Sequence, residues 1–156
     1  MSAQTRRPDK SQIEAVRKPT SPLRVAISGS FHRHFAAITD ARKRFENLGV
    51  TVLSPTGWTV LNPGAEFPLL AGDDSRDPEV LEKRHLDAIA IAMALYVVNP
   101  NSYLGTSAAF EIGWAAALRK PIFTQVPLRE SGIRFVVNAS GSPEEAVDLL
   151  LRASPT

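Results

Sequence analysis

The stretch from residue 94 to residue 121 constrains the fold more than any other part of the chain. It begins with a short apolar run, 94–98, continues through a polar loop with Pro100 and Gly105, and then becomes almost entirely small or apolar. A buried strand, a loop at its carboxyl end and a helix that starts there form half of a βαβ unit. Because ligands bind at the carboxyl ends of strands in open α/β sheets, this half unit also predicts where a crevice would open.

One carboxylate, Glu111, lies in the otherwise apolar helix of this stretch. A capping box would need Ser or Thr at position 108, which is Ala108. An i,i+4 ion pair would need Lys or Arg at 107 or 115, which are Ser107 and Ala115. A carboxylate without a partner on an apolar helix is costly unless it has a function. Glu111 is therefore either an exposed helix residue or a functional group at the crevice.

The rest of the chain alternates between strand and helix patterns. Strands are predicted at 23–28, 50–53, 94–98 and 122–125, with 133–137 as a further candidate, and helices at 35–48, 78–92, 106–119 and 143–152. The last helix has a strong start signal, with Ser142 as N-cap, Pro143 at the first position and Glu145 at the third. The alternation predicts an α/β fold: a doubly wound, mostly parallel sheet of four to five strands, flavodoxin-like or Rossmann-like, with helices on both faces.

Length and composition limit the class of protein. The 156 residues, with a hydrophobic fraction of 44%, suit one soluble domain. The apolar runs are too short for a membrane span, and the N-terminus has no signal-peptide core, so we expect a cytoplasmic protein without a membrane partner. With no cysteine and three histidines, we expect no disulfide, no metal site and no cofactor.

The basic character of the chain belongs to its N-terminal segment. Residues 1–24 hold six Lys and Arg against two acids, whereas residues 25–156 hold twelve against fourteen. The segment is polar and rich in Pro, so 1–22 is predicted to be a disordered basic leader and 23–153 a single α/β domain. A solvated leader is expected. An interaction arm, including one for nucleic acid, is the alternative, but the folded part has no basic stripe to support it.

A long irregular stretch, 54–77, separates the second strand from the second helix. It is rich in Pro, Gly and Asp, and loops of this length within a compact domain are often lids or binding loops. It contains Trp58 and Phe67. These aromatic residues either pin the loop to the core or form a stacking wall for a flat ligand.

Three stretches together resemble a known family. They are the Ser-Gly-Ser loop at 28–30, the helical Leu-Asp-Ala-Ile at 86–89, and the more specific run 105–121, which contains Phe-Glu-Ile-Gly at 110–113 and Arg-Lys-Pro at 119–121. In these residues the chain resembles the nucleoside 2-deoxyribosyltransferase superfamily, which includes the 2′-deoxynucleoside 5′-monophosphate N-glycosidases. The resemblance implies an enzyme, either a hydrolase or a transferase, that acts on a small nucleoside or nucleotide, and it implies a homo-oligomer.

The resemblance also implies roles for individual residues. Glu111 matches the nucleophilic glutamate, which attacks C1′ of the sugar and expels the base; the glycosyl ester then passes to water or to a second base. Asp87 matches a helix aspartate that positions the sugar or handles the proton on the base, with His85 as the reserve candidate. The predicted substrate-binding residues are Ser28, Gly29, Ser30, Arg33, Tyr103, Gly105 and Ser107.

A 5′-phosphate would find suitable donors among these residues. Ser28, Gly29 and Ser30 form a loop, Ser107 stands at a helix start and Arg33 carries charge, although Arg33 could equally be a solvated loop residue. Two positions depart from the family pattern. Met93 replaces a common Asp, and the loop 99–105 lacks the carboxylate of the transferases. We therefore expect hydrolysis of a phosphorylated substrate rather than base exchange, with a non-catalytic nucleotide-binding or sensing domain as the alternative.

Overall fold

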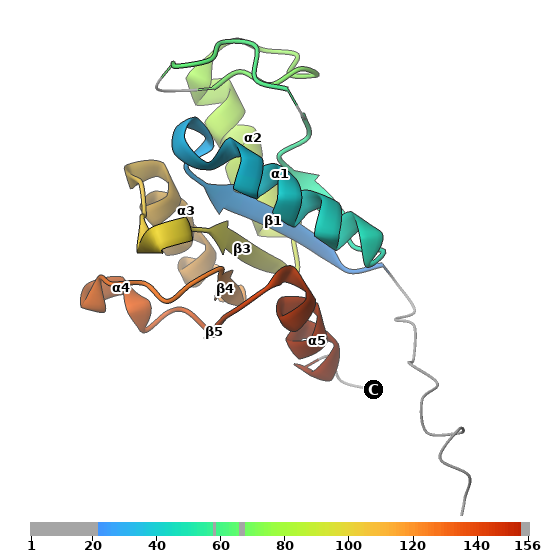
Figure 1. Ribbon diagram of the computed structural model, residues 1–156, viewed down its shortest axis with the longest axis vertical. Helices are drawn as coiled ribbons and strands as arrows, with labels where there is room; N and C mark the ends of the chain where they lie inside the picture. The colour runs from blue at the N-terminus through green and yellow to red at the C-terminus, as the bar shows by residue number, and fades with distance from the viewer. Residues whose placement is uncertain (1–21, 58, 66–67, 154–156) are drawn as a thin grey trace, which may run out of the picture.

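The computed structural model describes residues 22–57, 59–65 and 68–153. A parallel sheet lies between two layers of helices (Figure 1). The strands are β1 (Arg24–Gly29), β2 (Thr51–Ser54), β3 (Ala94–Val98), β4 (Ile122–Thr124) and β5 (Ala139–Ser140). The helices are α1 (Phe31–Asn47), α2 (Pro78–Ile91), α3 (Thr106–Ala117), α4 (Ser131–Arg134) and α5 (Pro143–Ala153), with a 3₁₀ turn, η2, at Pro100–Ser102.

The five strands follow the order β2-β1-β3-β4-β5, and every pairing is parallel. The predicted α/β fold with a parallel sheet is thereby confirmed. In this order the chain reverses its direction of winding between β1 and β3, and the carboxyl ends of these two strands flank a crevice. Gly29 pairs with Val98 at that end of the sheet.

Alternating strand residues supply two hydrophobic cores. Val25 and Ile27 pack with Phe45 in the cluster that includes α1 and α5, whereas Ala26 packs with Ile89 in the cluster that includes α2 and α3. Successive side chains of a strand point to opposite faces of a sheet. Ser28, which follows Ile27, therefore points toward the layer of α2 and α3, and this direction matters for the site described below.

The signals at helix starts are confirmed by hydrogen bonds. Asp77 caps α2 by accepting from the backbone N–H of Glu79 at 3.0 Å. At α5 the bonds are reciprocal, because Glu145 N donates to Ser142 Oγ at 3.2 Å while Ser142 N donates to Glu145 Oε2 at 2.6 Å. This is the capping box that the sequence predicts.

Helix α1 begins earlier than the sequence predicts. Ser30 is its N-cap and accepts from Arg33 N at 3.4 Å, so the turn at 31–34, expected to be loop, is helical. His34 marks a kink with φ −127° and ψ 29°, which separates this first turn from the regular helix behind it. The apolar period that predicts the helix begins only after this kink, which explains the late predicted start.

The predicted strand at 133–137 is wrong. Residues Ser131–Arg134 form the short helix α4, and the strand beside β4 begins after Asn138, whose backbone N–H donates to Ile122 O at 2.8 Å. Ile133, Val136 and Val137 are partly buried against the core of α2 and α3. A short helix and the turn after it thus bury these apolar side chains without strand pairing.

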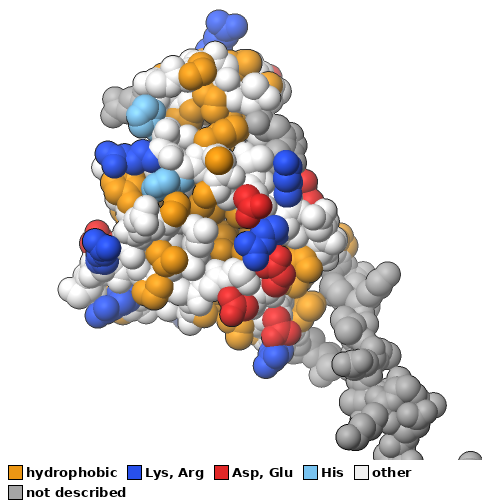
Figure 2. Space-filling view, viewed as in Figure 1, with side chains coloured by type: hydrophobic (Ala, Val, Ile, Leu, Met, Phe, Trp, Pro, Cys, Tyr) orange, Lys and Arg blue, Asp and Glu red, His pale blue; other side chains and the backbone are white. Residues whose placement is uncertain are grey.

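The surface over α1 and α5 mixes charges of both signs. Arg44 pairs with Asp40 on its own helix and with Glu144 on α5, and Figure 2 shows such acidic and basic side chains intermingled on this face. Within the described residues, no helix is both long enough and apolar enough to cross a membrane. The predicted leader, 1–22, lies outside the described residues except for its last member.

Candidate active site

A cavity of about 780 Å³ opens at the carboxyl ends of β1 and β2, beside the point where the strand order reverses. Its walls come from the first turns of α1 and α3, residues 81–88 of α2, and described parts of the stretch between β2 and α2. Cavities of this size commonly hold small molecules. The position is the one that the 94–121 half unit predicts.

Glu111 lies in the wall of this cavity, and its side chain is 7% exposed. Helix α3 turns it toward the sheet together with Ala108, Ile112 and Ala115, which are all buried. Its Oε2 atom accepts a short hydrogen bond from Ser28 Oγ, so a residue of strand β1 helps to fix the position of the carboxylate. The alternative of an exposed helix residue is therefore excluded.

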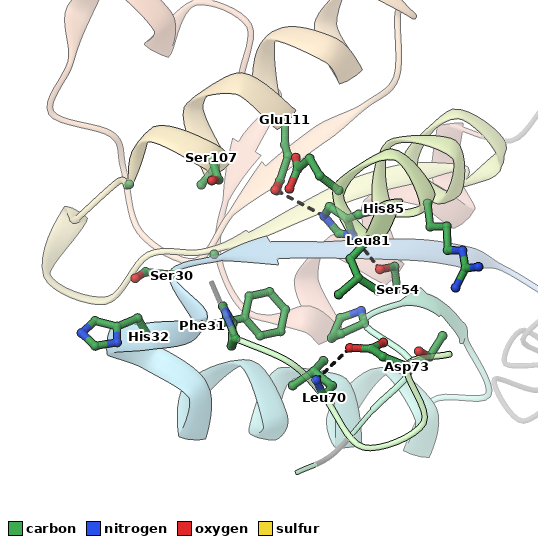
Figure 3. A pocket seen from close by; sticks show the side chains of 18 of the residues that line it. Ser30, Phe31, His32, Ser54, Leu70, Asp73, Leu81, His85, Ser107 and Glu111 are labelled. Carbon is green, nitrogen blue, oxygen red and sulfur yellow. Dashed lines mark hydrogen bonds and ion pairs between the residues drawn. The ribbon is translucent and has the colours of Figure 1, made fainter. Parts of the chain in front are cut away.

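His85 is the second partner of Glu111. Its Nε2 atom lies 3.2 Å from Glu111 Oε2, which is an ion-pair distance, although the geometry is not that of an aligned hydrogen bond (Figure 3). Its Nδ1 atom lies 2.6 Å from Ser54 Oγ. Burial lowers the pKa of His85, but the charge and hydrogen bonding of Glu111, together with the charge of Glu82, outweigh burial and raise this pKa above its ordinary value of 6.5. An imidazolium is thus favoured beside the carboxylate.

These contacts join four elements in one chain of side chains. Ser54 at the end of β2 contacts His85 on α2, His85 contacts Glu111 on α3, and Ser28 on β1 completes the chain from the other side. The carboxylate is consequently fixed in position by two partners at one oxygen, Oε2. A carboxylate held in this way is pre-organised for a reaction at its other oxygen.

Asp87, predicted as the catalytic partner of Glu111, is not part of this group. Its side chain is exposed, and it does not line the cavity. Each helical residue is rotated by about 100° from the one before it, so a residue two positions after His85 points about 200° away. The reserve candidate, His85, occupies the place that the sequence reasoning gives to Asp87.

The three residues of the Ser28, Gly29 and Ser30 loop differ in their surroundings. Ser28 is fully buried and does not line the cavity, so its hydroxyl supports Glu111 instead of contacting a ligand as predicted. Gly29 and Ser30 line the cavity. A Cβ at Gly29 would lie 2.8 Å from the carbonyl oxygen of Val98, and Gly29 has φ +156°, so this close approach of β1 and β3 requires glycine.

The other predicted substrate-binding residues lie at or just before the first turns of α1 and α3. Arg33, Tyr103, Gly105 and Ser107 all line it. The guanidinium carbon of Arg33 lies 4.2 Å from the centroid of the Tyr103 ring, a cation–π contact that limits the positions of the charge. Gly105 is the N-cap of α3, so the N-termini of α1 and α3 open onto the same space.

Glu82 is a cavity residue that the sequence reasoning does not single out. It lies one helical turn before His85, and its Oε1 atom is buried without a hydrogen-bond partner in the described structure. Burial, followed by the charge of Glu111, raises the pKa of Glu82, and His85 opposes this shift. The i,i+3 spacing of Glu82 and His85 on a helix that enters the crevice is the signal that could have revealed the pair.

The stretch between β2 and α2 lines the cavity, as expected for a binding loop. Val60 and Leu70 form an antiparallel bridge within it, and Asp73 Oδ2 accepts from Leu70 N at 2.8 Å. Asp74 is paired with Arg84 of α2. The predicted stacking residues, Trp58 and Phe67, lie outside the described residues.

Three remaining sequence expectations concern Met93, a metal site and the loop 99–105. Met93, which replaces a common Asp of the family, packs against the core shared with α1 and α5 and does not line the cavity. Among the described residues there is no group of three or more His, Asp or Glu side chains arranged to hold a metal ion. The loop 99–105 brings Tyr103 and Gly105 to the cavity.

No protein-family model and no curated protein sequence matches this chain. Among solved structures, the chain is similar to a CMP N-glycosidase, BcmB, of Clostridium botulinum, with a TM-score of 0.51 and 20% sequence identity over 81% of this chain and 96% of that one. It is also similar to a 2-deoxyribosyltransferase of Leishmania mexicana, with a TM-score of 0.55 and 16% identity over 86% and 100% of the two chains. These similarities establish a shared fold, and it is the fold that the family resemblance implies.

Proposed function

We propose that this protein hydrolyses the N-glycosidic bond of a nucleoside 5′-monophosphate, with Glu111 as the nucleophile. The observation that carries the proposal is the buried Glu111 carboxylate in the wall of a nucleotide-sized cavity, held at Oε2 by Ser28 and His85. A carboxylate in this setting suits attack on a sugar carbon through an oxocarbenium-like transition state. The two proteins of similar fold are named as enzymes that act on this kind of bond, one as a CMP N-glycosidase and the other as a 2-deoxyribosyltransferase.

The reaction would proceed in two steps. Glu111 Oε1, the oxygen not held by Ser28 and His85, attacks C1′ while the base leaves with the bonding electron pair. Water then attacks C1′ of the glycosyl ester and releases the sugar phosphate and the free carboxylate. His85 Nε2 lies 3.2 Å from Glu111 Oε2, and this contact would favour a single orientation of the carboxylate before the attack.

The end of the cavity beside α1 and α3 supports recognition of a phosphate. The first turns of α1 and α3 open onto it, and helix N-termini present backbone N–H donors and a positive dipole to anions. Arg33, held against Tyr103, supplies the positive charge. Hydrolysis is proposed over base exchange because the loop 99–105 contains no carboxylate to handle an incoming base.

A panel of nucleosides and their 5′-monophosphates, assayed for free base, tests the proposal. We expect release from at least one monophosphate, at a higher kcat/KM than from the matching nucleoside, and no faster transfer to an added free base than to water. Faster transfer would identify a transferase. Saturable binding of a monophosphate without any base release would instead support the non-catalytic nucleotide-binding domain and refute the hydrolase.

Arg33→Ala is expected to raise KM for the monophosphate by about 10-fold or more and to leave kcat/KM for the unphosphorylated nucleoside within about twofold, because a charge-assisted hydrogen bond to phosphate contributes on the order of 1.5–3 kcal/mol. Arg129→Ala is the matched control, since Arg129 is exposed and lies outside the cavity. Steady-state kinetics on both substrates measures the effect. An equal loss on both substrates would exclude Arg33 as the phosphate ligand.

The cytoplasmic location and the homo-oligomer also remain predictions. Three exposed apolar side chains follow one another at i,i+4 spacing along α3 and its C-cap, Phe110, Trp114 and Leu118. An exposed apolar stripe of this kind is compatible with contact between subunits. Light scattering on the purified protein measures the oligomeric state, and a monomer at all concentrations would contradict the prediction.

A further inference from the structure

We propose that Glu82 is the acid that gives a proton to the base as the glycosidic bond breaks, an inference that rests on the hydrolysis proposed above. Glu82 lines the same cavity as Glu111, and its Oε1 atom is buried without a hydrogen-bond partner in the described structure. A buried polar atom without a partner is costly, so in the wall of a cavity it marks a group that a ligand would satisfy.

The neighbouring histidine is less suited to this task. His85 has Nδ1 2.6 Å from Ser54 Oγ and Nε2 3.2 Å from Glu111 Oε2, so both ring nitrogens already face protein oxygens. A proton on His85 therefore points to the nucleophile or to Ser54. On the same face of α2, Glu82 has a carboxyl oxygen, Oε1, that makes no hydrogen bond within the described structure and is therefore suited to a ligand.

The position of Glu82 matches the expected place of the base. Helix α2 runs opposite to the strands, so its N-terminal residues lie nearer the mouth of the crevice at their carboxyl ends. Glu82 precedes His85 by three residues, about 4.5 Å along the helix axis. In Figure 3, Ser30 and Ser107 mark the proposed phosphate end, Leu81 and Ser54 lie at the other end, and Glu111 and His85 lie between them. A nucleotide with its phosphate at the first end and its sugar beside Glu111 would therefore place its base next to the turn of α2 that contains Glu82.

Burial and the charge of Glu111 favour the protonated form of Glu82. Glu111 faces it from α3 and His85 from its own helix. Asp73 and Asp74 line the cavity from the loop, and Arg84 pairs with Asp74. Because burial and the charge of Glu111 raise its pKa, Glu82 keeps its proton to higher pH than an ordinary glutamate. Two carboxyl groups whose environments separate their protonation states can divide the roles of acid and nucleophile.

The proposed step conserves atoms and electrons. Glu111 Oε1 forms a bond to C1′ as the bond from C1′ to the base nitrogen breaks and leaves its electron pair on the base. The proton of Glu82 moves to an acceptor on that base, either a ring nitrogen or a carbonyl oxygen, and Glu82 becomes a carboxylate. In the second step the attacking water gives one proton back to Glu82, and Glu111 leaves as a carboxylate. The substrate class is thus a nucleotide whose base must be protonated to leave.

A pair of substrates that differ in this requirement tests the proposal. A ring-methylated, cationic base leaves as a neutral molecule without a proton. The pair is guanosine 5′-monophosphate with its 7-methyl analogue if the protein prefers purines, or cytidine 5′-monophosphate with its 3-methyl analogue if it prefers pyrimidines, each with the preferred sugar. Glu82→Gln is expected to lower kcat on the normal nucleotide about 10²-fold and to leave kcat on the methylated one within about threefold.

The pH dependence gives a second readout. Since the acid must hold its proton, wild-type kcat on the normal nucleotide should fall as the pH rises through the pKa of Glu82, and kcat on the methylated nucleotide should lack this fall. Glu79→Gln is the matched control, because Glu79 lies on the same helix, is exposed and does not line the cavity. This variant should behave as the wild type with both substrates.

The outcomes separate the two proposals. Equal losses of kcat on both substrates in Glu82→Gln, or no loss on either, would overturn the role of Glu82 and leave the hydrolase function standing. Release of base from none of the nucleotides by the wild type would overturn the function and the role of Glu82 together. Turnover of the methylated substrate by Glu82→Gln also reports that this variant is folded.

Discussion

Glu111→Gln is expected to abolish base release, with kcat reduced by at least about 10³-fold, because an amide cannot form the glycosyl ester. The fold should survive. Gln is the same size as Glu, and its carbonyl oxygen can still accept the hydrogen bond from Ser28. Loss of the charge also removes the partner of His85, so the pKa of His85 should fall in this variant.

Two measurements check this expectation. Rapid quenching of the wild type with its substrate should give a protein mass increased by the sugar phosphate, and Glu111→Gln should give no such mass. Glu130→Gln is the matched control, since Glu130 is exposed and does not line the cavity. A Glu111→Gln protein that turned over at the wild-type rate would exclude a covalent role for this residue.

His85→Gln is expected to have the next largest effect, a fall in kcat of about 10²-fold with KM changed little. The proposed role of His85 is that of a positioning residue, because it contacts Glu111 and Ser54, and small misplacement of a reacting group can cost about this much. Since the nucleophile is needed for every substrate, the loss should be equal for the normal and the methylated nucleotide. This pattern is the opposite of that expected for Glu82→Gln, so one substrate pair distinguishes the two residues.

The raised pKa of His85 also predicts a pH dependence of stability. A histidine whose pKa is higher in the folded protein than its unfolded value of 6.5 stabilises the fold below pH 6.5 and loses this contribution as the pH rises through the folded pKa. The free energy of unfolding of the wild type should therefore fall across a step above pH 6.5, and His85→Gln should lack this step. Denaturant titrations at a series of pH values measure it, and a step that persisted in His85→Gln would belong to another group.

Asp87→Asn provides the comparison for His85. Asp87 is exposed and does not line the cavity, so its amide variant should keep kcat within about twofold of the wild type. Loss of activity in Asp87→Asn, with His85→Gln fully active, would return the catalytic role to the residue that the family resemblance indicates.

The sheet and most of its helices could be predicted because their signals are local. The apolar run 94–98, the caps at Asp77 and Ser142, and the spacing of apolar residues in α1 each act within a few positions. The two errors have different causes, the first local and the second tertiary. The first turn of α1 is set by the cap at Ser30 before a kink, and the run 133–137 is buried by a short helix instead of strand pairing.

The site was predictable at Glu111, because a lone carboxylate on an apolar helix is conspicuous in sequence. Its partners were not predictable from pattern alone. Asp87 and His85 differ by two positions on one helix, and the weak apolar pattern of α2 does not fix which of them faces α3. Ser28 could be placed after β1, but its contact with Glu111 depends on which face of the sheet its side chain occupies.

The chain of contacts from Ser54 to Glu111 has a consequence for how such a protein could acquire new substrates. The groups proposed to hold the sugar and phosphate come from the central strands β1 and β3 and the helices that follow them, whereas the proposed place of the base is bordered by the edge strand β2 and the stretch that follows it. An edge strand pairs on one side only, so insertions and exchanges after β2 disturb few hydrogen bonds. Base preference can thus diverge by replacement of the segment after β2, while the residues proposed to break the glycosidic bond stay unchanged. Ser54 limits this freedom, because its hydroxyl contacts His85, the residue proposed to orient the nucleophile.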